Sequence, residues 1–205
     1  MNKKLLIIGC PRSSTGYACK LLRALGLDIG HEVWGKHGMS CWWAIFDTYR
    51  PGVWYWPLDR DLQEFLDKYP KPLSYENCIV LHQTRYPLKV IRSLAYPHPV
   101  QPRAWRYVFH HIPGSMDDPI LLCAMRAWYY LNLEAEKKAL VTYPVEMLDP
   151  DGLCTASIPK GKAYNTNTAD RDTPEYTWDD LHAQDPELTK RIRELAARYG
   201  YKETT

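Results

Sequence analysis

The chain alternates between short apolar runs and longer stretches in which apolar residues recur every three or four positions. Apolar runs at residues 5–8, 78–81 and 139–143 have the length of strands that are buried on both faces of a sheet. Helical spacing follows the first of these runs and recurs over about 119–138 and 185–199. Strands that alternate with helices in this way predict an α/β fold with a mostly parallel central sheet flanked by helices.

Length and charge are those expected of one soluble domain spanning 1–205. A chain of 205 residues is long enough for one sizeable core. Its 26 basic and 24 acidic side chains nearly cancel, which removes the electrostatic case for a nucleic-acid partner. The first apolar run ends at Gly9, and no apolar stretch approaches the length of a membrane span. We therefore expect a cytoplasmic protein with no membrane partner.

The cysteines and histidines give no sign of a metal centre or a disulfide framework. The six cysteines are scattered, and no two of them form a C-x-x-C pair. His110 and His111 are adjacent in sequence, which is poor geometry for joint ligation of one ion on a helix or a strand. The sequence therefore predicts neither a structural zinc site nor a catalytic metal.

The loop after the first apolar run combines several features of an anion-binding site. It reads Gly9-Cys10-Pro11-Arg12-Ser13-Ser14-Thr15-Gly16. At the start of the helix that follows, backbone N–H groups and the positive end of the helix dipole face a bound anion, and Arg12 adds a fixed charge. The nucleoside-triphosphatase loop, G-x-x-x-x-G-K-[ST], has a glycine and a lysine where this chain has Ser14 and Thr15, so Mg-ATP chemistry is not expected.

This loop closely resembles the 5′-phosphosulfate loop of the sulfotransferases that use 3′-phosphoadenosine 5′-phosphosulfate (PAPS). The family's loop reads roughly P-[KR]-S-G-[ST]-[ST]. The chain departs from it by Ser14 where glycine is usual, and its glycine stands at position 16 instead. The arginine form is typical of the tyrosylprotein branch and of several carbohydrate and bacterial branches. The resemblance implies a P-loop NTPase-like sulfotransferase fold. It also implies that PAPS is bound by Arg12, Ser13, Ser14, Thr15, Gly16 and Tyr17.

A second motif of the same family follows the apolar run at 78–81. The family's 3′-phosphate motif is an arginine at the end of a strand, a proline two residues later and a serine eight residues after the arginine. Arg85, Pro87 and Ser93 match all three positions. Pro87 favours the first turn of a helix, and an arginine fork with a hydroxyl suits a phosphate dianion. The resemblance, with weaker motifs included, extends to about residue 181.

The resemblance also implies which residues do the chemistry. In the tyrosylprotein branch a glutamate stands about twenty residues after the loop arginine, and Glu32 stands at that distance from Arg12. Glu32 is the candidate base for the acceptor proton, with His31 as an alternative. Arg12 is expected to stabilise charge on the bridging oxygen, and fixed cations of this kind need no metal. A second cation is expected among Arg103, Arg106, Lys160, Lys162 and Arg171.

Three segments are expected to lie around this site. The segment 41–57 is rich in Trp and Tyr, which favours either an acceptor site for sugars or flat apolar molecules, or a homodimer interface. The segment 96–116 contains several prolines and predicts a long loop over the active site. The polar segment 151–175 predicts either a loop that closes over the nucleotide or a solvated linker.

The function implied by the resemblance is transfer of a sulfuryl group from PAPS to a hydroxyl or amine of a small molecule or carbohydrate. Adenosine 3′,5′-bisphosphate (PAP) is the product. Two alternatives stay open. One is a phosphotransferase of the nucleotide-kinase kind, which needs Mg²⁺ and a loop lysine. The other is a non-catalytic nucleotide-binding protein of the same fold.

Overall fold

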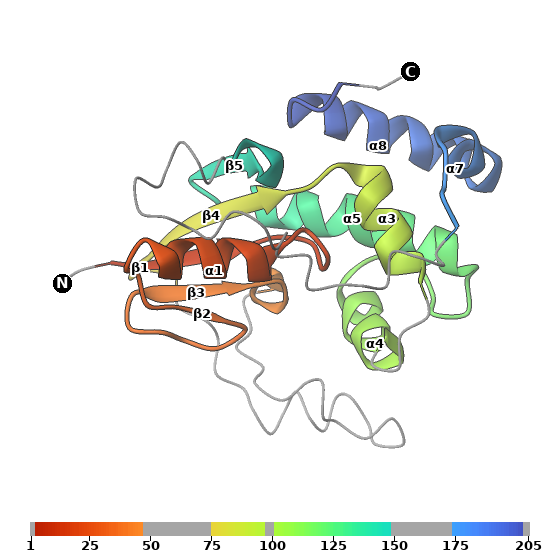
Figure 1. Ribbon diagram of the computed structural model, residues 1–205. Coiled ribbons are helices and arrows are strands. Elements are labelled where there is room, and N and C mark those ends of the chain that lie inside the picture. The colour runs from red at the N-terminus through yellow and green to blue at the C-terminus, as the bar shows by residue number, and fades with distance from the viewer. Residues whose placement is uncertain (1–2, 47–74, 97–100, 149–173, 203–205) are drawn as a thin grey trace.

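A five-stranded parallel sheet forms the centre of the molecule (Figure 1). The computed structural model describes residues 3–46, 75–96, 101–148 and 174–202. Within these residues the strand order is β2-β3-β1-β4-β5, and every neighbouring pair is parallel. The strands are β1 (Lys4–Ile8), β2 (Ile29–His31), β3 (Gly38–Cys41), β4 (Cys78–Thr84) and β5 (Val141–Pro144). The predicted α/β class with a parallel sheet is confirmed.

Helices cover both faces of this sheet. The described helices are α1 (Thr15–Ala24), α3 (Pro87–Ala95), α4 (Gln101–His111), α5 (Ile120–Glu136), α7 (Trp178–Gln184) and α8 (Pro186–Arg198). Ser40 of β3 donates a hydrogen bond to α1, whereas His82 of β4 bonds Asn132 of α5, and the strand register puts these two side chains on opposite faces. Of the described helices, none has the length and apolar character that a bilayer crossing requires.

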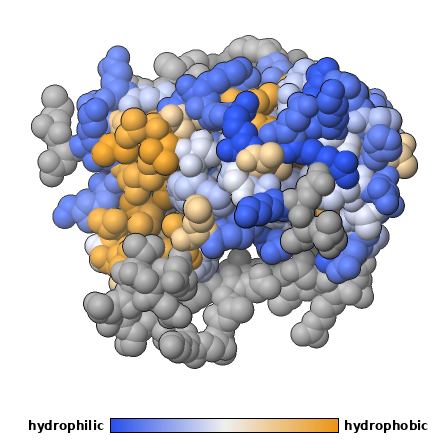
Figure 2. All heavy atoms as spheres, turned by 90° about the horizontal axis from the view of Figure 1, so that it is seen from above, coloured by the Kyte–Doolittle hydropathy of each residue, from blue (hydrophilic) through white to orange (hydrophobic). Residues whose placement is uncertain are grey.

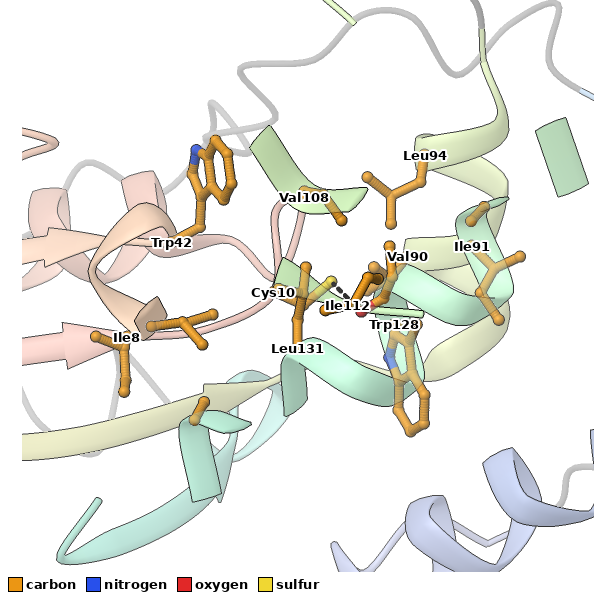
Figure 3. Packing of buried hydrophobic residues seen from close by; sticks show 14 of the residues in the cluster. Ile8, Cys10, Trp42, Val90, Ile91, Leu94, Val108, Ile112, Trp128 and Leu131 are labelled. Carbon is orange, nitrogen blue, oxygen red and sulfur yellow. Dashed lines mark hydrogen bonds between the residues drawn. The ribbon is translucent and has the colours of Figure 1, made fainter. Parts of the chain in front are cut away.

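The main core lies on the α5 face of the sheet. Leu6 and Ile8 of β1 are fully buried there with Trp128 and Leu131 of α5. Figure 3 shows α3 side chains, among them Val90, packed into the same cluster. Burial of each of these large apolar side chains stabilises the fold by about 1.5–3 kcal/mol, so the relative position of β1, α3 and α5 is firmly fixed.

Local capping signals explain where the last two helices begin. The Thr177 side chain accepts a hydrogen bond from the Asp180 amide, and the Asp180 carboxylate accepts one from the Thr177 amide, which together form a capping box. Asp185 caps α8 through the Leu188 amide at 2.9 Å, and Pro186 occupies the first helical position. The start of α8 agrees with the helical spacing that the sequence shows over about 185–199.

The strand order determines where a ligand site is expected. Strand β1 lies between β3 and β4. The chain leaves β1 through α1 toward β2 on one side, and it leaves β4 toward β5 on the other side. The connections therefore diverge at the carboxyl ends of β1 and β4. In open α/β sheets, the crevice at such a switch point is the usual place for a ligand.

Strands β2 and β3 are parallel neighbours joined by only six residues, 32–37. A parallel connection usually contains a helix, so this crossover is unusually tight. It is accommodated by glycines: a Cβ on Gly30 would lie 1.9 Å from the carbonyl oxygen of Val33, and one on Gly38 would lie 1.9 Å from that of Leu5. The crossover places Glu32 at the sheet edge with a φ of 60°. Strand β3 was not predicted from the sequence.

Two predicted site segments need correction. The predicted loop 96–116 contains helix α4, because Pro102 is its second residue and proline is tolerated in a first helical turn. In the segment 41–57, Trp42 and Trp43 are 2 % exposed and pack in the core, so neither lines an open acceptor site. Residues 47–57, and all but the end of the predicted loop 151–175, lie outside the described residues.

An apolar surface lies at the β5 edge of the sheet. Seen from above, apolar side chains gather toward the left of the molecule (Figure 2). The exposed large apolar residues at the start of β5 and on the neighbouring strand β4 are Leu140, Val141 and Ile79. Part of the exposed apolar surface therefore lies at the β5 edge. Trp42 and Trp43 contribute nothing to the exposed surface, because both are buried.

The buried His82 predicts a pH dependence of stability. Its ring is fully buried, its Nε2 bonds Asn132 Oδ1 at 2.9 Å, and burial lowers its pKa to about 4. In the unfolded chain the His82 ring is protonated near pH 6.5. The contribution of the neutral, buried ring to the free energy of unfolding is therefore fully present above that pH, and about 3 kcal/mol of it is lost as the pH drops to 4. Urea unfolding of His82→Gln should show a flatter profile between these pH values. Parallel profiles for the two proteins would contradict this assignment.

Candidate anion-binding site

Backbone strain gathers at the carboxyl edge of the sheet. Among the described residues, the non-glycine residues with positive φ are Arg12 (69°), Ser14 (66°) and Glu32 (60°). Arg12 and Ser14 lie in the loop after β1, and Glu32 follows β2. Such conformations cost on the order of 1–3 kcal/mol each and are typical of functional sites. The strain therefore points to the same edge as the strand order.

The loop after β1 lies directly against the end of β4. A Cβ on Gly9 would be 2.3 Å from the carbonyl oxygen of Gln83, which is closer than any van der Waals contact allows. Gly9 is therefore required for this close approach rather than for an unusual φ. The approach brings the loop within reach of the β4 side chains.

Side chains from β3 and from the end of β4 hold two carbonyl groups of the loop and one at the start of α1. Gln83 Nε2 donates to the carbonyl of Ser13, Arg85 Nη1 donates to that of Arg12 at 3.1 Å, and Ser40 Oγ donates to that of Thr15 at 2.9 Å. The carbonyl oxygens are thereby turned toward the sheet. This arrangement fixes the orientation of the peptide groups between them.

The amides of Ser14, Thr15 and Gly16 form the anion-binding feature of this loop. Within the described residues these three consecutive N–H groups donate no hydrogen bond to protein atoms. They stand at the N-terminus of α1, where the helix dipole is positive. Consecutive amides beside a left-handed residue form a concave nest that binds anions. The geometry therefore suits a phosphate or sulfate group.

Ser13 adds a donor beside this nest. Its side chain is fully buried, yet its Oγ has no hydrogen-bond partner among the described residues. A buried hydroxyl without a partner costs about 1–3 kcal/mol. An anion at the nest offers the acceptor atoms that this part of the chain lacks.

The loop contains one cation, Arg12, and is contacted by a second, Arg85. Burial lowers the pKa of the half-buried Arg12 guanidinium, which nevertheless stays a cation at neutral pH. Arg85 is half-buried, and its carbonyl accepts a bond from Trp128 Nε1 at 3.3 Å. Beyond its bond to the carbonyl of Arg12, the Arg85 guanidinium donates no hydrogen bond within the described residues. The bond from Arg85 Nη1 to the Arg12 carbonyl therefore brings these two candidate site residues side by side.

Both candidate bases lie at this edge. His31 Nε2 is 3.4 Å from Thr15 Oγ1, and its ring lies 3.5 Å from where a Gly16 Cβ would be. Glu32 donates its amide to the carbonyl of Ser40 at 3.0 Å. Burial chiefly, and the nearby Glu32 carboxylate to a lesser extent, raise the pKa of the Cys41 thiol. The Glu32 carboxylate therefore lies toward the end of β3.

The remaining predicted site residues lie on α1, α3 and α4 or outside the described residues. Ser93 is half-buried on α3, and within the described residues no hydrogen bond links it to Arg85. Tyr17 is half-buried in the first turn of α1. Among the candidates for a second cation, Arg103 and Arg106 belong to α4. Lys160, Lys162 and Arg171 lie outside the described residues.

Gln83 and Tyr143 are site residues that sequence reasoning missed. Gln83 is fully buried, and its Oε1 accepts a bond from Tyr143 Oη at 3.0 Å while its Nε2 holds the loop. Burial raises the pKa of Tyr143, which keeps it a neutral donor. The available signal was the polar run 82–84 at the end of a central parallel strand, where apolar residues are the rule.

Comparisons of this chain with protein-family models, curated proteins and solved structures gave no match. The functional interpretation therefore depends on the residues of the site. In the described part of the chain, no group of three or more His, Cys, Asp or Glu side chains is placed to hold a metal ion. The groups that could hold an anionic co-substrate are the loop amides, Ser13, Arg12 and Arg85.

Gly9→Ala tests the close approach of the loop to β4. The added Cβ would meet the Gln83 carbonyl at 2.3 Å, so we expect unfolding free energy to fall by about 1–3 kcal/mol in urea titrations. Gly16→Ala is the matched control. A Cβ there meets only the His31 ring at ordinary contact distance, so stability should change by less than about 1 kcal/mol. Equal stability of the two variants would refute the packing argument.

Proposed function

We propose that this protein is a PAPS-dependent sulfotransferase with a P-loop NTPase-like sulfotransferase fold. The observation that carries the proposal is the row of three unpaired amides at Ser14, Thr15 and Gly16, with Arg12 and Arg85 beside it. The connections that leave β1 and β4 in opposite directions across the sheet support the proposal as well. The proposed acceptor is a hydroxyl or amine of a small molecule or carbohydrate.

The 5′-phosphosulfate is proposed to bind the loop. The amides of Ser14, Thr15 and Gly16 would donate to its oxygens, as would the orphaned hydroxyl of Ser13. Charge-assisted hydrogen bonds of this kind contribute about 1.5–3 kcal/mol each. Because the loop carbonyls are held toward the sheet, these donors need little reorganisation when the anion arrives.

The 3′-phosphate is proposed to bind Arg85. This guanidinium keeps donors available beyond its one bond to the loop, and its planar fork matches phosphate oxygens. Ser93, two turns along α3, is the proposed second contact. A PAPS molecule would then lie across the switch point between β1 and β4.

The chemical step is an in-line transfer. The acceptor oxygen attacks sulfur, the bond from sulfur to the bridging oxygen breaks, and PAP leaves with the electron pair. Arg12 would stabilise the negative charge on that bridging oxygen. The acceptor proton passes to the Glu32 carboxylate, with His31 as the alternative base. A lysine of the kind that Mg-ATP chemistry requires is missing from this loop.

Calorimetric titration with PAP tests the nucleotide site. We expect micromolar binding that is unchanged by EDTA, and weaker binding of ADP and Mg-ATP. Arg85→Ala should weaken PAP binding at least about tenfold, because it removes the proposed 3′-phosphate fork. The control is Arg92→Ala on α3, which removes an ion pair to the exposed Glu175 and should leave the affinity unchanged. Preference for Mg-ATP would favour the kinase alternative and overturn the proposal.

Glu32→Gln separates binding from catalysis. The variant should bind PAP normally, because the carboxylate contacts the acceptor rather than the nucleotide. It should transfer radiolabelled sulfuryl from PAPS to a panel of phenols and monosaccharides about 10²–10⁴-fold more slowly. His31→Gln is the comparison and should retain most of the rate. A large loss of rate in His31→Gln with a nearly normal rate in Glu32→Gln would assign the base to His31. Normal rates in both variants would rule out both candidates.

A further inference from the structure

A cavity of about 630 Å³ opens between α7, α8 and the end of β4. Its volume lies within the range of small-molecule pockets, which is about 300–1,000 Å³. The lining residues are Tyr86, Trp178, Arg193, Glu194, Ala196, Ala197, Gly200, Tyr201 and Lys202. Thr84, which bonds Tyr201, points to the sheet face opposite the one that Gln83 and α1 occupy. The cavity is therefore distinct from the anion-binding loop.

Three aromatic side chains form the walls of this cavity. The rings of Tyr86 and Trp178 meet edge to face, with centroids 6.5 Å apart and planes at 89°. Tyr86 meets Tyr201 in a similar way at 5.8 Å and 68°. Edge-to-face contact is one of the arrangements that aromatic rings prefer, so these walls can make the same kind of contact with a planar aromatic ligand.

Polar groups in the same cavity favour an anionic ligand. The Arg193 guanidinium lies 5.0 Å from the centroid of the Trp178 ring, and Lys202 adds a second cation beside one carboxylate, Glu194. The Nε1–H of Trp178 is buried and has no hydrogen-bond partner among the described residues. A ligand oxygen would satisfy this donor while pairing with a cation.

The walls are held in place before any ligand binds. Tyr201 Oη bonds Thr84 Oγ1 at 3.1 Å and Glu146 Oε2 at 3.0 Å. The second oxygen of Glu146 accepts the amide of Tyr86 at 3.1 Å. Glu146 thus ties two of the three aromatic walls to the end of the sheet. Such preorganisation lowers the entropy that a ligand must lose on binding.

We propose that this cavity is a binding site for a planar aromatic carboxylate. The ring of the ligand lies among Tyr86, Trp178 and Tyr201. Its carboxylate accepts from Trp178 Nε1–H and pairs with the Arg193 guanidinium.

The proposal can be tested apart from the proposed sulfuryl transfer, because neither the loop residues 9–16 nor Arg85 and Ser93 line the cavity. Arg85 is nevertheless near one wall: burial raises the pKa of Tyr201, and the charge of Arg85 acts to lower it.

Ligand-observed NMR titrations with 2-naphthoate, 2-naphthylmethanol and 2-naphthylmethylamine test this proposal with the full chain. The carboxylate should bind at least about tenfold tighter than the alcohol, and the amine should bind weakest. Trp178→Phe keeps an aromatic ring but removes the N–H donor, so it should weaken 2-naphthoate about fivefold. Arg193→Gln should reduce the preference for the carboxylate over the alcohol to about twofold.

Arg191→Gln is the matched control, because Arg191 lies on the same helix, outside the cavity, and pairs with Glu187. It should leave all three affinities unchanged. Circular dichroism of each variant verifies that α7 and α8 remain folded. The proposal is overturned by absence of 2-naphthoate binding at millimolar concentration, by equal affinities for the three probes, or by equal effects of Arg191→Gln and Arg193→Gln.

Discussion

The close approach of Gly9 to the carbonyl of Gln83 is the constraint on which the site depends. It lets the loop after β1 lie against β4 without an intervening side chain. From this position Gln83 and Arg85 reach the loop carbonyls, and Ser40 reaches another from β3. The amides at the start of α1, which have no acceptor within the helix, lie next to these tethered carbonyls. The absence of a side chain at Gly9 thus allows the packing of the loop against β4 on which the geometry of the anion-binding nest depends.

The strain at this edge is sustained by the structure around it. Arg12 and Ser14 hold left-handed conformations, and so does Glu32, the first residue of the six-residue crossover between β2 and β3. Hydrogen bonds to the loop carbonyls and the packed core beneath offset this cost. The same edge gathers two arginines and both candidate bases. An anionic ligand would balance the positive charge of the two arginines. Backbone strain held at such an edge is typical of a binding site.

The features predicted correctly from sequence are those with local causes. The run 5–8, the glycine that ends it and the spacing after it specify a strand, a loop and a helix without reference to distant residues. Asp185 and Pro186 likewise specify the start of α8. Strand β3 was missed because it has four residues and depends on pairing with β1. The role of Gln83 was missed because it arises from a contact with Ser13, seventy positions earlier in sequence.

Titration of the nitrogen-15-labelled protein with PAP, followed through the amide chemical shifts, tests the proposed role of the loop. The largest shifts are expected at Ser14, Thr15 and Gly16, with smaller ones at the end of β4. The shifts should saturate together with calorimetric binding. Saturable binding that leaves these three amides unmoved would contradict the central claim that the unpaired amides of this loop hold the anionic co-substrate.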